Sequence, residues 1–209
     1  MKKLTEVVKA SLDDAQFSPS IMLHFTPGIW VNEKCYWLQD CREKIIYEEK
    51  LTLKVMEEQI HSKIKLFHLY VRNHSSQDKR IKILGMHYHP RFLKDHFAFI
   101  SPADHLIFHF FSNKHIYLVN GQNHGTGMKE YTIQPFWHVF TGQIWSSLDK
   151  GTLEFQPIMK GMVSSIFTLE ELIRANTSAK FNTWMIIGQT KAELVSFDWV
   201  LKKHTGNSI

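Results

Sequence analysis

Cysteine and long apolar runs are both scarce in this chain. Only two cysteines, Cys35 and Cys41, occur in 209 residues, and two cannot supply the disulfide framework of a small secreted domain. The five residues between them match no common zinc-binding or redox spacing. We therefore expect two reduced thiols with structural roles.

Segments that would carry the chain into or across a membrane are also lacking. No apolar run approaches the roughly 20 residues that a membrane-spanning helix needs. Glu6 and Lys9 interrupt the stretch that would have to form the apolar core of a signal peptide. The sequence therefore predicts a cytoplasmic protein without a transmembrane segment.

The signatures of common hydrolases and nucleotide-binding enzymes are missing. The chain contains no G-x-S-x-G, H-E-x-x-H or Walker A motif. Glycines lie at Gly121, Gly125 and Gly127, but a β-prone run follows them instead of the helix that a phosphate-binding loop requires. We expect a hairpin loop there. These absences argue against an enzyme, and no cofactor is expected.

Alternation of apolar and polar residues dominates the chain from residue 21 onward. The hydrophobic fraction of 44% suits a chain that builds a core. Roughly ten short β-prone runs follow one another at the spacing typical of a sandwich or barrel, the last of them over residues 195–202. Long helices do not alternate with these runs, as a parallel α/β sheet would require. We predict an all-β fold: an antiparallel β-sandwich, immunoglobulin-like in general architecture.

The chain reads as one main domain with short ends. Apolar residues at helical spacing predict a short amphipathic helix over residues 3–16, within an N-terminal segment of residues 1–20. Residues 21–204 form the single β-sandwich domain, since no linker or internal repeat divides them. Residues 205–209 are expected to be a frayed tail.

Positive charge is concentrated in one stretch. The net charge is +5, and residues 61–96 contain eight Lys and Arg but only two Asp. Two alternating runs in this stretch flank a polar turn at residues 73–78, which predicts a β-hairpin. A basic hairpin can attract an acidic protein, a nucleic acid or an anionic membrane. It can equally be a solvated face whose lysines protect an edge strand. The candidate partner contacts are Lys63, Lys65, Arg72, Arg80 and Lys82.

The same stretch ends in two histidines, His87 and His89. Residues i and i+2 of a strand face the same side, so these two imidazoles could bind one metal ion. A third ligand would come from His96, His105 or His109.

Strand parity favours a different role for this pair. If Gly85 introduces no bulge, His87 and His89 share the face of Ile81 and Ile83. We then expect the histidines to pack on the core side of the sheet, and a metal site is the less favoured reading.

Aromatic residues cluster in the segment of residues 136–145, here called the aromatic segment. Buried aromatics form a core or anchor a protein interface, whereas exposed ones can stack on bases or sugars. Trp137 and Trp145 are therefore candidate contacts for a partner.

Three functions remain open at this stage. The favoured one is a non-enzymatic binding module, such as an adaptor, assembly factor or subunit. It docks a macromolecule through the basic hairpin and the aromatic segment, and a protein is the favoured partner. The second is a nucleic-acid-binding protein that uses the same basic face. The third is a histidine-metal enzyme with His87 and His89 as ligands. The partner's identity and the oligomeric state are not encoded in any motif.

Overall fold

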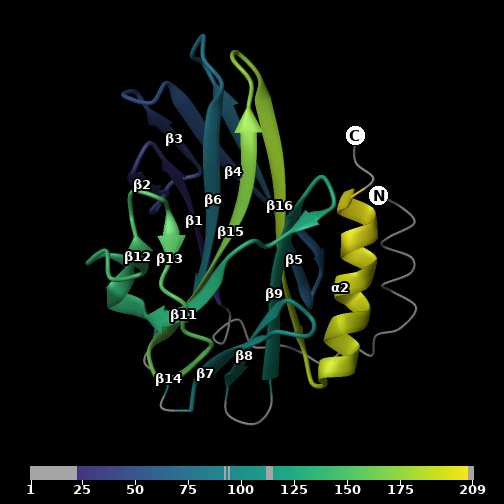
Figure 1. The fold of residues 1–209 in the computed structure, drawn as a ribbon. Helices are drawn as coiled ribbons and strands as arrows, with labels where there is room; N and C mark the ends of the chain where they lie inside the picture. Colours follow the sequence, from purple (N-terminus) through teal and green to yellow (C-terminus); the bar gives the residue numbers. More distant parts are fainter. Residues whose placement is uncertain (1–22, 92, 94, 112–114, 207–209) are drawn as a thin grey trace.

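Two large antiparallel sheets, a two-stranded ribbon, a short 3₁₀ helix and one C-terminal α-helix make up the part of the chain that the computed structural model describes (Figure 1). The described residues are 23–91, 93, 95–111 and 115–206. Strands predominate, which confirms the prediction of a mostly β, antiparallel fold. The helix predicted over residues 3–16 lies outside the described residues.

The smaller sheet has five strands in the order β11-β15-β6-β1-β2, all antiparallel to their neighbours. The strands are β1 (His24–Val31), β2 (Lys34–Trp37), β6 (Lys79–Tyr88), β11 (Tyr131–Pro135) and β15 (Val163–Ile173).

The larger sheet follows the order β14-β7-β8-β9-β16-β5-β4-β3, with the short β10 paired to β9. Its strands are β3 (Glu43–Ile46), β4 (Leu51–His61), β5 (Ile64–Asn73), β7 (Phe97–Ser101), β8 (Leu106–Phe111), β9 (His115–Asn123), β10 (Thr126–Gly127), β14 (Ile158–Lys160) and β16 (Ser178–Gly188).

The expected hairpin loop between Gly121 and Gly127 is confirmed, because β9 and β10 pair across it. His124 and Gly125 at its tip both have positive φ, at 45° and 78°. That combination is the requirement of a tight two-residue hairpin turn.

The main core lies between the two sheets. Alternate side chains of strands from each sheet meet there, and they include Leu69 and Val71 on β5 and Ile81 and Ile83 on β6. Removing such side chains from water is the main stabilising term, at roughly 25 cal/mol per Å². The core therefore joins strands that are not hydrogen-bonded to one another.

Gly85 permits the closest approach in this core. The ring of Phe167 lies 2.4 Å from the place where a Cβ at position 85 would sit, so any side chain there would displace the ring. The pairing of β6 with β1 and β15 continues through Gly85 without a register shift. The bulge considered at this glycine is absent, and the parity of the strand is preserved.

The predicted basic hairpin is wrong. Strands β5 and β6 belong to different sheets: β5 pairs with β4 and β16, while β6 pairs with β1 and β15. The turn between them carries the chain from one sheet to the other. Asn73 secures it by donating from its amide to the carbonyls of Gln77 (2.7 Å) and Ile173 (3.2 Å). Alternation predicts strands, but it does not say which strands pair.

The final strand expected over residues 195–202 is also wrong, because α2 (Lys191–Gly206) occupies this stretch. Its buried residues Leu194, Phe197 and Leu201 follow helical spacing, whereas Trp199 is exposed. The helix covers the outer face of the larger sheet, against β9 and β16 (Figure 1). The helix includes Thr205 and Gly206, which were expected to belong to the frayed tail.

A capping signal marks the start of this helix. Thr190 Oγ1 accepts a hydrogen bond from the Glu193 N–H, and Glu193 accepts one in return from the backbone of Gln189. Thr190-x-x-Glu193 therefore works as a capping box. Among the described residues no helix is long and apolar enough to cross a bilayer.

Asp198 connects α2 to the sheet beneath it. This buried carboxylate accepts hydrogen bonds from Asn120 Nδ2 (2.8 Å) and Trp184 Nε1 (2.9 Å) and pairs with Lys202 Nζ (2.8 Å). A buried charge is tolerated only when its partners are in place. The contacts therefore fix the position of the helix on the sheet.

We expect the substitution Asp198→Ala to lower the free energy of unfolding by roughly 2–4 kcal/mol, because it leaves the Asn120 and Trp184 donors buried without an acceptor. Lys202→Gln removes only the partly exposed ion pair and should cost below about 1 kcal/mol. Urea denaturation of both variants measures the difference. Equal losses would contradict this role of Asp198.

The outer face of the smaller sheet is covered by residues 136–153. This stretch contains the 3₁₀ helix η2 (Phe136–Val139) and the two-stranded ribbon of β12 (Trp145–Ser147) and β13 (Thr152–Leu153). Its Val139, Ile144 and Leu153 pack on side chains of β1, β6 and β15. Both sheets are therefore covered on their outer faces over part of their area.

Candidate functional site

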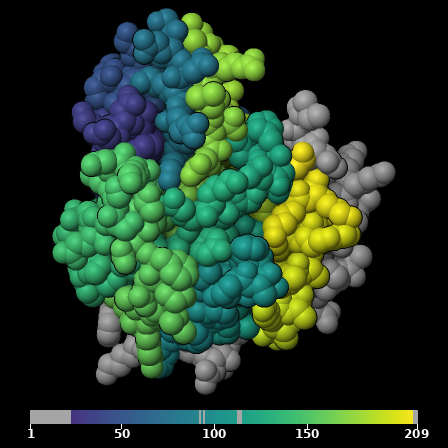
Figure 2. All heavy atoms as spheres, viewed as in Figure 1, coloured from purple at the N-terminus to yellow at the C-terminus, as the bar shows by residue number. Residues whose placement is uncertain are grey.

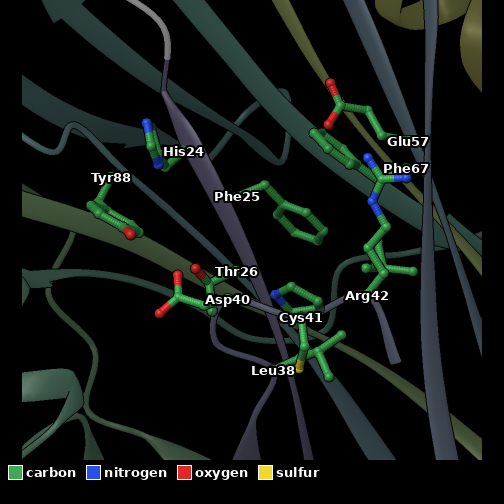
Figure 3. A pocket seen from close by; sticks show the side chains of 12 residues that line it. His24, Phe25, Thr26, Leu38, Asp40, Cys41, Arg42, Glu57, Phe67 and Tyr88 are labelled. Atoms are coloured by element: carbon green, nitrogen blue, oxygen red, sulfur yellow. The ribbon is translucent and has the colours of Figure 1, made fainter. Parts of the chain in front are cut away.

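A cavity of about 420 Å³ opens beside the N-terminal end of β1 (Figure 3). It lies between β1 of the smaller sheet and β4 and β5 of the larger sheet, and the connection from β2 to β3 forms its rim. The lining residues are His24, Phe25, Thr26, Pro27, Leu38, Asp40, Cys41, Arg42, Val55, Glu57, Phe67 and Tyr88.

The wall of the cavity is aromatic and its rim is charged. The rings of Phe25 and Phe67 lie with their centroids 4.4 Å apart. Arg42 extends toward Phe67 and Glu57 (Figure 3), and the Glu57 carboxylate also pairs with Lys65 Nζ at 2.6 Å. An apolar wall with a few charged groups at its edge is the usual composition of a binding pocket.

The rim is held at both of its ends. The Leu38 N–H donates to the Pro27 carbonyl (2.9 Å), and the Val55 N–H donates to the Arg42 carbonyl (2.8 Å). Asp40 between them has a φ of 53°, a left-handed conformation that Asp adopts more readily than most residues. The local sequence therefore forms a fixed turn that presents Cys41 beside the cavity.

The two cysteines differ in reactivity. Neither forms a disulfide, as expected from the sequence. Burial raises the pKa of the Cys35 thiol to about 12, against the opposing charge of Lys44, so this thiol carries almost no thiolate at neutral pH. Cys41 is exposed, and thiolate and exposure together govern alkylation.

We expect a maleimide at neutral pH to modify Cys41 alone in the folded chain and both cysteines after unfolding. Intact-mass spectrometry gives the number of adducts, and peptide mapping gives their positions. The variant Cys41→Ser should stay unmodified until denaturant is added. Rapid labelling of Cys35 in the folded chain would show that it is not buried as described.

His87 lies on the core side of β6, as strand parity predicted, and His89, one residue beyond the end of the strand, is also buried. His87 is 0% exposed and contacts the rings of Phe25 and Phe167, with centroids at 4.8 and 6.0 Å. Neither of its ring nitrogens has a hydrogen-bond partner among the described residues. The Nδ1 of His89 accepts from the Arg91 N–H at 3.1 Å.

Two of the other histidines considered as ligands lie in the same core. His109 on β8 bonds through Nδ1 to His96 Nε2 (3.0 Å) and through Nε2 to Ser165 Oγ (2.8 Å). His105 lies elsewhere, with its Nδ1 3.0 Å from the hydroxyl of Tyr131. Within the described ranges, no three His, Cys, Asp or Glu side chains are arranged to hold a metal ion. His87, His96 and His109 form a buried row, in which His96 and His109 are hydrogen-bonded to each other and His87 has no hydrogen-bond partner among the described residues.

Burial determines the charge of this row. It lowers the pKa of His87 to about 3 and, with a contribution from neighbouring His89, that of His96 to about 4. Burial and the neighbouring imidazoles hold the pKa of His109 well below its ordinary value. The three imidazoles are therefore neutral in the folded chain, since desolvation penalises their charged form.

We expect stability to fall with acidification below about pH 6.5, the pKa of an exposed imidazole. The unfolded chain then binds protons that the folded chain excludes, at a cost of ~1.4 kcal/mol per pH unit for each of these three histidines. This stabilisation is complete above pH 6.5 and is lost as the pH falls toward the folded pKa values.

The substitution His87→Phe removes one of these imidazoles, so the slope of the unfolding free energy against pH should decrease by the equivalent of one proton. Urea denaturation at several pH values between 7 and 5 measures this slope. Trp199→Phe, at an exposed position of α2 without a titratable group, serves as the control and should leave the slope unchanged. A wild-type stability that is constant over this range would contradict the neutral row.

The predicted basic contacts do not form one surface. Lys63 pairs with Glu193 (3.0 Å), and Lys65 with Glu57. Lys82 is only 8% exposed, because it is enclosed under residues 136–153 with Glu130 (3.0 Å), Glu170 (3.3 Å) and the Gly151 carbonyl (2.9 Å).

The two arginines among these contacts are exposed but belong to different sheets. Arg72 lies on β5 and donates to Ser178 Oγ (3.3 Å), while Arg80 lies on β6. The positive charge that is concentrated in the sequence is therefore partly offset by carboxylates, and its carriers are divided between the two sheets.

The aromatic segment is divided between core and surface. Phe136 and Trp145 pack against the cluster on the outer face of the smaller sheet. Trp137 and Phe140 are exposed, at 55% and 51%. Of the two predicted tryptophan contacts, only Trp137 therefore presents most of its ring to solvent.

Sequence reasoning missed the cavity. Its residues come from four separate strands and one connection, and no motif links them. No protein-family model matches the chain, and the search of curated proteins finds no relative.

Proposed function

We propose that the chain is a non-enzymatic β-sandwich, immunoglobulin-like in general architecture, that acts in the cytoplasm as a binding module for another protein. An adaptor, an assembly factor or a subunit would each fit this role. The proposal rests on where the exposed apolar side chains lie.

Exposed apolar residues concentrate in one stretch of the chain. Of the ten large hydrophobic side chains that are exposed among the described residues, five fall between positions 137 and 158. This stretch belongs to the green lobe beside the first strands (Figure 2). We call these five residues the exposed apolar set: Trp137, Phe140, Leu148, Phe155 and Ile158.

Two of the three aromatics of this set, Trp137 and Phe140, lie in a hydrogen-bonded turn. Trp137 lies in η2, and its carbonyl accepts hydrogen bonds from the N–H groups of Phe140 (3.2 Å) and Thr141 (3.3 Å). The Phe140 ring packs edge-on against Phe136 at 5.2 Å. A Trp side chain has only two rotatable bonds, so it loses little conformational entropy on binding, which is one reason that interface energy concentrates in such residues.

The basic residues give a nucleic-acid partner less support. Lys63, Lys65, Lys79 and Lys82 are each paired with a carboxylate, so their charge is locally offset. Phosphate binding needs cations that are free to replace counterions. A protein partner that buries apolar surface agrees better with this arrangement.

We expect the double variant Trp137→Ala with Phe140→Ala to lose partner capture at least about tenfold, because truncating an interface anchor typically costs more than 1 kcal/mol. Quantitative affinity purification from the source cells, with mass spectrometry, compares this variant with the wild type.

Trp199→Ala is the matched control, since Trp199 on α2 is equally exposed, at 58%, but lies outside the set. The supporting result is a defined group of proteins retained by wild type and by Trp199→Ala and lost by the double variant. Identical recoveries from all three chains would reject this surface.

A further inference from the structure

Half of β1 lacks a neighbour on one of its sides. The strand pairs with β6 from His24 to Trp30, but with β2 only from Gly28 to Val31. The Pro27 carbonyl is also bonded on the β2 side, so among the described residues positions 24–26 are paired on the β6 side alone. This bare edge forms one wall of the cavity described above.

The main-chain groups of Phe25 point to the bare side. The Pro27 carbonyl accepts from Leu38 on the β2 side (2.9 Å). In an antiparallel sheet, the N–H and C=O of one residue point to the same side, and successive residues alternate. Phe25 is two residues from Pro27, so its N–H and C=O face the cavity. Pro27 itself has no N–H to leave unpaired.

The cavity also supplies room for a side chain at this point. A strand residue directly opposite Phe25 would project its side chain to the same face as the Phe25 ring. There it would meet Val55 and Phe67 of the larger sheet. A volume of about 420 Å³ accommodates one large apolar side chain, and an aromatic one would bury ~150–250 Å².

We propose that an extended segment of a partner protein adds to the β1 edge at Phe25 and inserts a large apolar side chain between Phe25, Val55 and Phe67. Strand addition of this kind gains affinity from main-chain hydrogen bonds and selectivity from a side-chain pocket. Arg42 and Glu57 at the rim oppose one another in charge, so the segment need not be strongly acidic or basic. This inference rests on the proposed protein-binding function but uses a different surface.

Selection of short random peptides displayed on phage, using the intact chain, tests the inference. We expect enriched sequences to share one large apolar residue within a β-prone run. A bulky fluorescent maleimide attached to Cys41, on the rim, should obstruct the cavity. We expect this blocked chain to bind synthetic versions of the enriched peptides at least about tenfold more weakly than the unlabelled chain. Cys41→Ser treated with the same reagent is the control and should bind normally.

Several results would overturn the inference. These are the absence of enrichment, equal binding to the blocked chain, or enriched peptides that resemble residues 1–22 of the chain itself, which would make the occupant intramolecular. The Trp137→Ala with Phe140→Ala variant should bind the peptides as the wild type does. Loss of capture by that variant and loss of peptide binding by the blocked chain are therefore separate readouts.

Discussion

Burial of two apolar sheet faces against each other is the constraint on which the rest of this structure depends. Strands β5 and β6 are neighbours in sequence, yet each pairs with strands that are distant along the chain, and they meet only through the core. Such burial, at roughly 25 cal/mol per Å², outweighs the short-range preference for a hairpin. The row of buried histidines is accepted within this core because it stays neutral and because Ser165, His96 and His109 are hydrogen-bonded to one another.

The covering of the two sheets determines which surfaces remain for binding. Helix α2 occupies one outer face, and residues 136–153 occupy part of the other. What stays open is the exposed apolar set, three of whose members lie on the second cover, and the mouth of the core beside β1. The two surfaces have different chemistry: exposed aromatic and aliphatic side chains in the first, and main-chain groups with a side-chain pocket in the second. The proposed protein-binding function uses these two surfaces, and the basic residues, being largely paired, define neither.

Much of the local structure could be predicted from the sequence, whereas the long-range pairing could not. Parity placed His87 on the face of Ile81, and residues on a continuous strand obey that rule without reference to other strands. The helix at 191–206 was missed because Val195, Phe197 and Trp199 also alternate; Leu194 and the box Thr190-x-x-Glu193 carried the signal for a helix. Lys82 could not be foreseen as buried, since Glu130 and Glu170 are distant in sequence. The cavity could not be predicted either, because it is lined by strands that are distant in sequence.

The assignment of β5 and β6 to opposite sheets is tested most directly by cross-strand nuclear Overhauser effects in solution. Phe25 and His87 face each other as a pair that is not hydrogen-bonded, where the α-carbons lie closest, at about 4.5 Å. We therefore predict a strong contact between the α-protons of these two residues and no α-proton contacts between strands 64–73 and 79–88. A ladder of contacts between those two strands would show a hairpin, and it would contradict both the shared core and the free edge at Phe25.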